Sequence, residues 1–325
     1  MRYLSVCSGI EAATVAWHSL GWQAVGFAEI EKFPAKVLAH HYPTVPNFGD
    51  LTKHDQWPLE GGSVDLVVGG TPCQSFSVAG LRQGLDDSRG QLTFEYVRLA
   101  QRLRPRWIVW ENMPGVLSSG GGRDFGSFLG ALANLGYGVC YRVLDAQYFG
   151  VAQRRRRVFV VGYLGDWRRA AAVLLERESV RGDAPSKRAQ DATHVDICDE
   201  VLCRCCGIIW VPEGQLECCP VCGSMQSWCE NICSTISDGA HMGGGLNGQD
   251  ATSGRVLVDC GQPRRLTPRE CERLQGFPDD YTDIRPRGKD TPDGPRYKAL
   301  GNSMAVPVMR WIGERIARVE EITKG

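Results

Sequence analysis

The chain lacks several features that would assign a protein to a class at once. Its 37 basic and 37 acidic residues cancel, so binding to nucleic acid would require positive charge gathered on one face. No stretch of about 18 apolar residues occurs, and we therefore expect no membrane span. Residues 1–20 have no basic start followed by an apolar core, so we expect no signal peptide and a cytoplasmic location. Internal repeats and low-complexity tracts are also missing.

Cysteine, by contrast, is abundant, with 14 residues in a chain of 325. Without a secretion signal a reducing compartment is expected, where clustered cysteines more often mark a metal site or catalysis than disulfides. The hydrophobic content of 43% and the charged content of 23% are ordinary for a globular protein. The length allows one large domain and a smaller one.

Short apolar runs alternate with helical patterns through the first half of the chain. The runs predict strands, and the patterns between them predict helices. The predicted strands are 4–7, 24–28, 64–68, 107–110, 139–144 and 158–161, and the predicted helices are 11–20, 30–40, 92–103 and 125–135. This alternation predicts an α/β fold with a doubly wound, mostly parallel sheet covered on both faces.

The pattern changes after residue 166, and residues 178–265 are rich in Cys, Gly and polar residues. Regularity returns at Thr267-Pro268-Arg269-Glu270, a capping box with Pro at the first helical position, and this helix should stop at Gly276. Gly301-Asn302-Ser303 is expected to be a polar loop, and a last helix is expected to follow it through about Arg318. The predicted domains are a catalytic domain of residues 1–166 and 296–325 and a second domain of residues 167–295.

Cys73 is a candidate nucleophile. It lies in the loop Gly69-Gly70-Thr71-Pro72-Cys73-Gln74, directly after the predicted strand 64–68. Open α/β sheets place their chemistry at the carboxyl ends of strands, and a thiolate is a strong nucleophile when cationic or dipolar groups lower its pKa. Taken alone, the dipeptide Pro72-Cys73 is also compatible with a small buried cysteine beside a turn.

Glu111 and two arginines are candidates for the same site. Glu111 follows the predicted strand 107–110, although an acid there could equally cap a helix. The run Gln153-Arg154-Arg155-Arg156-Arg157 precedes the predicted strand 158–161. In an extended segment, Arg155 and Arg157 point to one face and their two neighbours to the other. We therefore expect Arg155 and Arg157 in the site, and Arg154 and Arg156 in solvent or on phosphates.

Together these segments make the chain resemble the DNA (cytosine-5) methyltransferase family, in its prokaryotic or phage form. The matching segments occur in the family's order and span nearly the whole chain apart from roughly 166–262. They are Val6-Cys7-Ser8-Gly9-Ile10, Pro72-Cys73-Gln74, Ser88-Arg89-Gly90-Gln91-Leu92, Glu111-Asn112, Gln153 to Arg157, Arg264 to Cys271, Gln275-Gly276-Phe277-Pro278 and Gly301-Asn302-Ser303.

The resemblance implies a covalent mechanism in which the Cys73 thiolate adds to carbon 6 of a flipped-out cytosine. Carbon 5 then takes a methyl group from S-adenosylmethionine. Glu111 would bind ring nitrogen 3 and the exocyclic amine, a role suited to a desolvated carboxyl of raised pKa. Arg157 and Arg155 would hold the cytosine carbonyl and a nearby phosphate and favour the thiolate. Flipping costs roughly a few kcal/mol.

The resemblance also implies a cofactor site. Ser8, Gly9 and Ile10 would lie under the methionine part, and Cys7 stands where the family often has phenylalanine against the adenine. Glu29 would accept hydrogen bonds from ribose hydroxyls, as acidic residues do in nucleotide-binding folds. The remaining expected contacts are Ile30, Asp50, Leu51, Pro72, Leu92, Asn302 and Ser303.

Two Cys-x-x-Cys turns predict a structural zinc site. Cys203 and Cys206 precede Cys219 and Cys222 by a spacing that fits four thiolate ligands, within a knuckle over residues 200–224. The alternative is a set of free buried thiols. Cys205 and Cys218 leave the register open, and Cys198, Cys229 and Cys233 have no assigned role.

The segment between the arginine run and Arg264 would read the DNA sequence. Its loop 243–248 is either a backbone-rich contact to DNA or a plain flexible loop. The expected partner is double-stranded DNA, with a monomeric enzyme and a possible companion restriction endonuclease. Two alternatives stay open: the same chemistry on RNA, and a catalytically inactive zinc-bearing DNA-binding protein.

Overall fold

The computed structural model describes residues 1–72, 91–175, 201–202, 209–210, 256–259, 262–285 and 288–322. The contacts between residues divide the chain into two compact units. The first comprises Met1–Asp145, Arg156–Ala184 and Ser303–Gly325, and the second comprises Ala146–Arg155 and Pro185–Asn302. The sequence-based boundaries at 166 and 296 differ from these, and the role assigned to the second domain stays a prediction.

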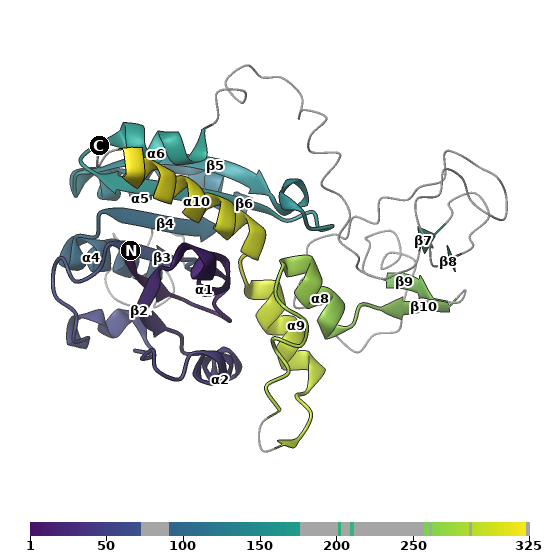
Figure 1. Ribbon diagram of the computed structural model, residues 1–325. Coiled ribbons are helices and arrows are strands. Elements are labelled where there is room, and N and C mark those ends of the chain that lie inside the picture. The colour runs from purple at the N-terminus through teal and green to yellow at the C-terminus, as the bar shows by residue number, and fades with distance from the viewer. Residues whose placement is uncertain are drawn as a thin grey trace. The chain divides into compact units, whose positions relative to one another are not determined.

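The first unit is built on a six-stranded mixed sheet (Figure 1). Its strands are β1 (Arg2–Val6), β2 (Gln23–Ala28), β3 (Leu66–Gly69), β4 (Trp107–Asn112), β5 (Tyr137–Asp145) and β6 (Arg156–Leu164), in the order β2-β1-β3-β4-β6-β5. The four strands from β2 to β4 are parallel, whereas β6 is antiparallel to both β4 and β5. The predicted α/β fold with a mostly parallel sheet is confirmed.

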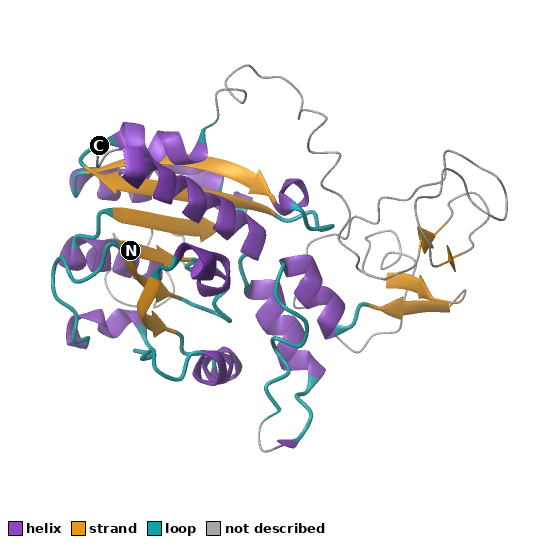
Figure 2. Ribbon diagram, viewed as in Figure 1, coloured by secondary structure: helices purple, strands orange, loops and turns teal. Residues whose placement is uncertain are grey.

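Helices cover both faces of this sheet (Figure 2). They are α1 (Ala12–Trp17), α2 (Lys32–His41), α4 (Gln91–Leu103), α5 (Arg123–Asn134), α6 (Trp167–Leu174) and α10 (Val306–Ile322). Strand β4 shows the two-sided packing, because Ile108 and Trp110 join a core with residues of α4 and α5. Trp107, which alternates to the other face, instead donates its indole N–H to Glu320 of α10 (2.9 Å). The uninterrupted apolar sequence of β4 follows from burial on both sides.

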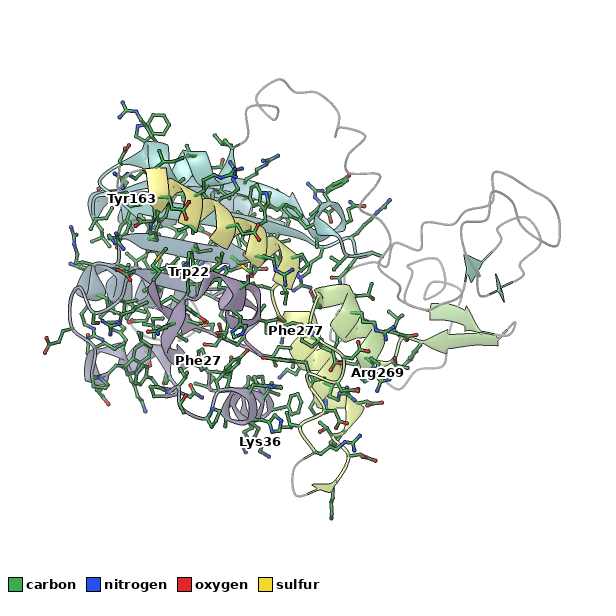
Figure 3. All side chains as sticks on the ribbon, in the orientation of Figure 1. Trp22, Phe27, Lys36, Tyr163, Arg269 and Phe277 are labelled. Atoms are coloured by element: carbon green, nitrogen blue, oxygen red, sulfur yellow. The ribbon has the colours of Figure 1, made fainter. Side chains whose placement is uncertain are left out.

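On the face of the sheet that α10 covers, Trp17 of α1 contacts both β1 and α10. Its ring meets Tyr3 of β1 edge to face, with centroids 5.1 Å apart, and its indole N–H donates to the carbonyl of Met309 (2.7 Å). The last helix of the chain thus completes the core that the first strand and helix begin. On β2, Phe27, which Figure 3 labels, packs against Tyr42 with ring centroids 5.5 Å apart.

Within its described residues, the second unit contains helices α8 (Pro268–Gln275) and α9 (Asp293–Asn302) and two antiparallel pairs of strands. The pairs are β7 (Val201–Leu202) with β8 (Ile209–Trp210), and β9 (Val256–Asp259) with β10 (Gln262–Arg265).

The predicted capping box of α8 is confirmed. Thr267 accepts from the Glu270 backbone N–H (3.3 Å), and the Glu270 carboxylate accepts from the Thr267 backbone N–H (2.6 Å). Gly276 ends the helix in the left-handed conformation, at φ 78°.

Helix α9 is a correction to the sequence-based expectation of a loop at Gly301-Asn302-Ser303. Gly301 and Asn302 are its last residues, and only Ser303 lies beyond it. The Gly-Pro start and late glycine weaken the local helix signal, and tertiary contacts supply the stability that propensity does not. Among the described helices, none is both long and apolar enough to cross a membrane.

Candidate active site

The carboxyl ends of the four parallel strands carry several candidate residues of the first unit. Ser8 and Gly9 follow β1, Glu29 follows β2, and Gly70 follows β3. Glu111 is the second-to-last residue of β4. Because neighbouring parallel strands end at one edge of the sheet, residues far apart in the sequence meet there.

Glu111 and Arg157 form an ion pair at this edge. The Arg157 Nε lies 3.1 Å from Glu111 Oε1, and Glu111 is only 8% exposed. The pair forms because β6 runs antiparallel beside β4, with Val158 opposite Asn112. Charges that are shielded from water in this way interact more strongly than a surface pair. The geometry therefore fixes the orientation of the carboxylate.

Gly70 makes room for that carboxylate. A Cβ atom built on Gly70 would lie 2.8 Å from Glu111 Oε2, 3.3 Å from the Glu111 carbonyl oxygen and 3.4 Å from the Met304 methyl carbon. Only glycine fits here without moving the Glu111 side chain. Gly70 thus has a packing role that sequence analysis did not assign.

Thr71 is held by three hydrogen bonds that sequence analysis missed. Its hydroxyl accepts from the Trp110 indole N–H (3.0 Å) and shares a hydrogen bond with the Thr93 hydroxyl (2.9 Å). Its carbonyl accepts from the Asn112 side-chain amide (2.8 Å). All four residues are buried. These bonds join β4 and α4 to the residue just before Pro72, so the last described residues of this loop are firmly anchored. The one sequence signal was that Asn112 adjoins Glu111.

Glu29 links the ends of β1 and β2. Its Oε2 accepts from the Gly9 backbone N–H (2.7 Å) and its Oε1 from the Glu31 backbone N–H (2.7 Å). The side chain of Asn47 brackets the Glu29 backbone, accepting from its N–H (2.9 Å) and donating to its carbonyl (3.0 Å). Asn47 was missed because nothing in its local sequence indicates this contact.

The other predicted cofactor residues of the first unit differ in their burial. Ile30 is 70% exposed beside Glu29, whereas Ile10 and Leu51 are buried. Asp50 caps the short helix η2 (Leu51–Gln56) by accepting from Thr52 N–H (2.9 Å). The rest are Cys7, Ser8, Pro72, Leu92 and Ser303, of which Pro72 is exposed and Ser303 buried.

Burial raises the pKa of three groups here. It raises the pKa of Cys7 to about 12, with Glu29 and Asp50 adding to the effect, so this thiol stays protonated and is no nucleophile near neutral pH. Burial also raises the pKa of Glu29, against the hydrogen bonds from Glu31 and Gly9. The pKa of Glu11, at the start of α1, rises to about 7 for the same reason.

The arginine run alternates as predicted. Arg154 and Arg156 are exposed, Arg155 is buried and Arg157 is half-buried. Arg155 belongs to the second unit, where its Nη2 donates to the Gly301 carbonyl (3.0 Å). Asn302, another predicted cofactor residue, also belongs to the second unit and is exposed.

Several predicted residues lie outside the described part of the chain. Among them are Cys73 and Ser88-Arg89-Gly90, the loop 243–248, the four predicted zinc ligands Cys203, Cys206, Cys219 and Cys222, and Cys198, Cys205, Cys218, Cys229 and Cys233. Within the described ranges, no group of three or more His, Cys, Asp or Glu residues could hold a metal ion.

The first unit has the Rossmann-like fold found in methyltransferases. The chain belongs to the family of C-5 cytosine-specific DNA methylases, which matches residues 1–200 and 226–318. Among solved structures, a putative DNA modification methyltransferase encoded within a prophage of E. coli is similar in fold. Its TM-score is 0.59 at 18% identity, over 99% of both chains.

Two curated relatives cover almost the whole chain. A protein of Escherichia phage P1 named DNA N-6-adenine-methyltransferase is 36% identical over 97% of this chain, which spans 61% of the relative's length. The Type II methyltransferase M2.BsuMI of Bacillus subtilis is 30% identical over 98% of this chain and 76% of its own.

Proposed function

We propose that this chain is a site-specific DNA cytosine-5 methyltransferase that uses Cys73 as its nucleophile. The proposal rests on one observation above all: a buried carboxylate paired with an arginine at the strand edge where the Pro72-Cys73 loop begins. The family assignment independently supports cytosine in DNA as the substrate.

The chemistry of cytosine explains why these groups are needed. Carbon 5 is a poor nucleophile until a group adds to carbon 6. A bond between Cys73 Sγ and carbon 6 makes carbon 5 enamine-like, and loss of the carbon 5 proton after methyl transfer breaks the same bond and releases the thiolate. Thr71, two positions before Cys73, is held by hydrogen bonds from Trp110 and Asn112, which supports a fixed starting point for this loop.

Glu111 would hold the flipped base by its ring nitrogen 3 and exocyclic amine. Its Oε1 is engaged by Arg157, and its Oε2 faces Gly70, where no side chain intervenes. Arg157 would orient the carboxylate and offer positive charge to the cytosine carbonyl and to the Cys73 thiolate. A base inside a duplex must leave the stack to reach such groups.

The residues at the ends of β1 and β2 fit S-adenosylmethionine, which supplies the methyl group when bound. A buried acid, Glu29, suits a ribose diol, and the exposed Ile30 beside it offers apolar surface to an adenine ring. The carboxylate of Glu29 is oriented by two backbone N–H groups, so it is preorganised as an acceptor. Ser8 and Gly9 would contact the methionine part through the backbone.

The second unit would read the DNA sequence and carry one zinc ion on Cys203, Cys206, Cys219 and Cys222. The paired strands β7 and β8 flank residues 203–208, which include the first Cys-x-x-Cys. Two thiolates from one Cys-x-x-Cys commonly bind zinc together, and zinc in such sites stabilises the fold. Metal analysis should find one zinc per chain, reduced in a Cys203→Ser, Cys206→Ser variant.

The name of the phage P1 relative raises a second candidate, transfer to the adenine N-6 amine. That amine attacks a methyl donor directly and needs no thiol adduct. A chain with Cys in the loop and a Glu–Arg pair beside it is instead suited to ring activation. The Type II name of M2.BsuMI suggests a companion restriction endonuclease for this chain too.

The test is transfer of labelled methyl from S-adenosylmethionine to unmethylated duplex DNA, to RNA, and to neither. Nucleosides of the product are separated by mass spectrometry, and bisulfite sequencing locates the methylated cytosines. Cys73→Ser is the matched control. We expect 5-methylcytosine in one short DNA context and none with the variant.

Other outcomes each reject the proposal in a defined way. N6-methyladenine that persists in Cys73→Ser would assign the adenine reaction. Methylation of RNA but not of DNA would show that RNA is the substrate of the same reaction. If the folded, zinc-loaded protein binds DNA tightly but transfers no methyl group, it is a catalytically inactive DNA-binding protein.

A further inference from the structure

Two side chains from distant parts of the sequence border one small space beside Gly70. A Cβ atom built on Gly70 would lie 2.8 Å from Glu111 Oε2 and 3.4 Å from the methyl carbon of Met304. Gly70, Glu111 and Met304 all belong to the first unit. Because both side chains reach so close to a single point, the Met304 thioether lies beside the Glu111 carboxylate.

The backbone on both sides of Met304 is held in place. Ser303 and Ala305 are each 4% exposed, and the Ser303 hydroxyl donates to the Met304 carbonyl (3.1 Å). Helix α10 begins two residues after Met304 and is anchored by the Trp17 indole N–H, which donates to the Met309 carbonyl (2.7 Å). The thioether therefore projects from a fixed segment of the first unit.

The burial of Met304 differs from that of a core methionine. Met309, five residues further along the chain, is fully buried, as expected for a side chain that only packs the core. Met304 is half-buried, and its methyl end meets Gly70 at the carboxyl end of β3. Part of an apolar side chain is thus open to solvent next to a buried carboxylate.

A flipped base needs two kinds of surface in its pocket. Its edge carries hydrogen-bonding groups, which Glu111 and Arg157 would meet, with Arg157 Nε 3.1 Å from Glu111 Oε1. Its faces lose their stacking partners when the base leaves the duplex, and apolar side chains replace them. A methionine thioether suits this contact, because it is flexible and polarisable and packs well on aromatic rings.

We propose that Met304 is a base-binding residue, which packs its thioether against the ring of the flipped cytosine beside the edge that Glu111 binds. The inference rests on the proposed function, in which Glu111 holds the base. With the base bound, Met304 also keeps water from the Glu111 carboxylate. Gly70 allows both contacts, because a side chain there would fill the space that the carboxylate and the thioether share.

The test measures how much of the affinity for DNA depends on the target base. Duplexes carry the sequence context found in the methyl-transfer assay, with either cytosine or an abasic site at the target position. Dissociation constants are measured by fluorescence anisotropy, with S-adenosylhomocysteine present so that no methyl group is transferred. We expect Met304→Ala to bind the cytosine duplex about five- to tenfold more weakly and the abasic duplex as the parent does, because only the first loses an apolar contact.

Two further variants define the contact. Met304→Leu keeps the volume and the apolar character, so it should restore most of the affinity for the cytosine duplex. Met113→Ala is the matched control, since Met113 lies two residues after Glu111 and is 51% exposed, and it should shift both dissociation constants equally. In methyl transfer, Met304→Ala should raise KM for DNA with little change in kcat, as loss of a contact made in both the ground and transition states predicts.

Several results would overturn the proposal. Equal weakening of the cytosine and abasic duplexes by Met304→Ala would show a structural role, and unchanged binding of both would show none. Weaker binding of S-adenosylmethionine, with the difference between the duplexes unchanged, would place Met304 at the cofactor instead. If Met304→Ala does not fold, Met304→Gln, which is similar in length but polar, replaces it and is compared with Met304→Leu in the same way.

Failure of this inference can be told from failure of the proposed function. If the parent chain forms 5-methylcytosine in DNA and Met304→Ala keeps the parent's affinity for both duplexes, only the role of Met304 is wrong. If the parent chain forms no 5-methylcytosine in DNA, the proposed function is wrong and the inference falls with it.

Discussion

Glu11 shows how one residue can make stability depend on pH. It starts α1 with φ 69°, in the left-handed region that a non-glycine residue adopts at a cost, and its carboxylate accepts from the Thr14 N–H (3.2 Å). Burial raises its pKa from 4.5 to about 7. The groups that act on this carboxyl are Ser5 and Thr14, which lower the pKa, and Glu29, which raises it.

The sign follows from proton linkage. Between pH 4.5 and 7 the folded protein keeps a proton on Glu11 that the unfolded chain gives up, so stability falls as the pH rises through this range. We expect Glu11→Gln to match the parent at pH 5 and to exceed it at pH 8, by about 3 kcal/mol at most. Urea unfolding at the two pH values measures this. Equal differences at both would show that Glu11 does not titrate in this range.

Gly70 links the conformation of one loop to the carboxylate of Glu111. Because a Cβ there would lie 2.8 Å from Glu111 Oε2, we expect Gly70→Ala to displace the carboxylate and lower kcat on the order of 10- to 100-fold. Thermal stability should change little, since the displaced atom is the end of a side chain. Gly115→Ala, whose Cβ would meet nothing within 4 Å, is the control in the methyl-transfer assay. Equal kcat in both variants would contradict the packing role.

At the scale of residues, the sequence predicted two features of the candidate site. Glu111 at a strand end and the alternation of the four arginines follow from local rules, and both are observed. The partner of Arg155 could not be predicted, because Gly301 lies 146 residues further along the chain. Thr71 and Asn47 were missed for the same reason: their hydrogen bonds are made to distant segments.

At the scale of elements, two helical glycines lie in opposite surroundings. A Cβ on Gly313 of α10 would come 2.3 Å from the Trp17 indole nitrogen, whereas one on Gly130 of α5 would meet nothing within 4 Å. We expect Gly313→Ala to destabilise the protein by about 1–3 kcal/mol, because the buried indole cannot move aside. Gly130→Ala should stabilise it by about 0.5–1 kcal/mol, since alanine favours a helix. Denaturant unfolding of both variants gives the comparison, and a shared sign would refute the role of close packing at Gly313.

The helices also show what local sequence can and cannot specify. Helix α8 was predicted correctly at both ends because its capping box and terminal glycine lie within the helix and its flanks. Helix α9 was not predicted, since its end is capped by residues from α8 and from the segment 153–155. A cap supplied by tertiary structure leaves no local pattern.

At the scale of the whole molecule, the first unit is closed by the end of the chain. Glu320 of α10 accepts from the Trp107 indole N–H (2.9 Å) and from Arg106 Nη1 (2.9 Å), more than 200 residues away. We expect Glu320→Ala to cost about 1–3 kcal/mol, because a buried indole N–H loses its acceptor. The exposed neighbour Glu321→Ala should change stability by about 0.5 kcal/mol or less. Thermal unfolding followed by circular dichroism measures both. Equal effects would show that the hydrogen bonds of Glu320 do not contribute to stability.

The sequence by itself determined the parts of this protein that local physics encodes. Apolar runs and helical periods predicted the alternating strands and helices, and the capping box predicted α8. The position of Glu111 at a strand end predicted its place among the site residues. Tertiary structure alone decided that β6 runs antiparallel beside β4, that Arg157 therefore meets Glu111, that Arg155 caps α9, and that α10 completes the core begun by β1. The reason is physical. Backbone preference and side-chain period act over a few residues, whereas these contacts form only when segments far apart in the chain are packed together.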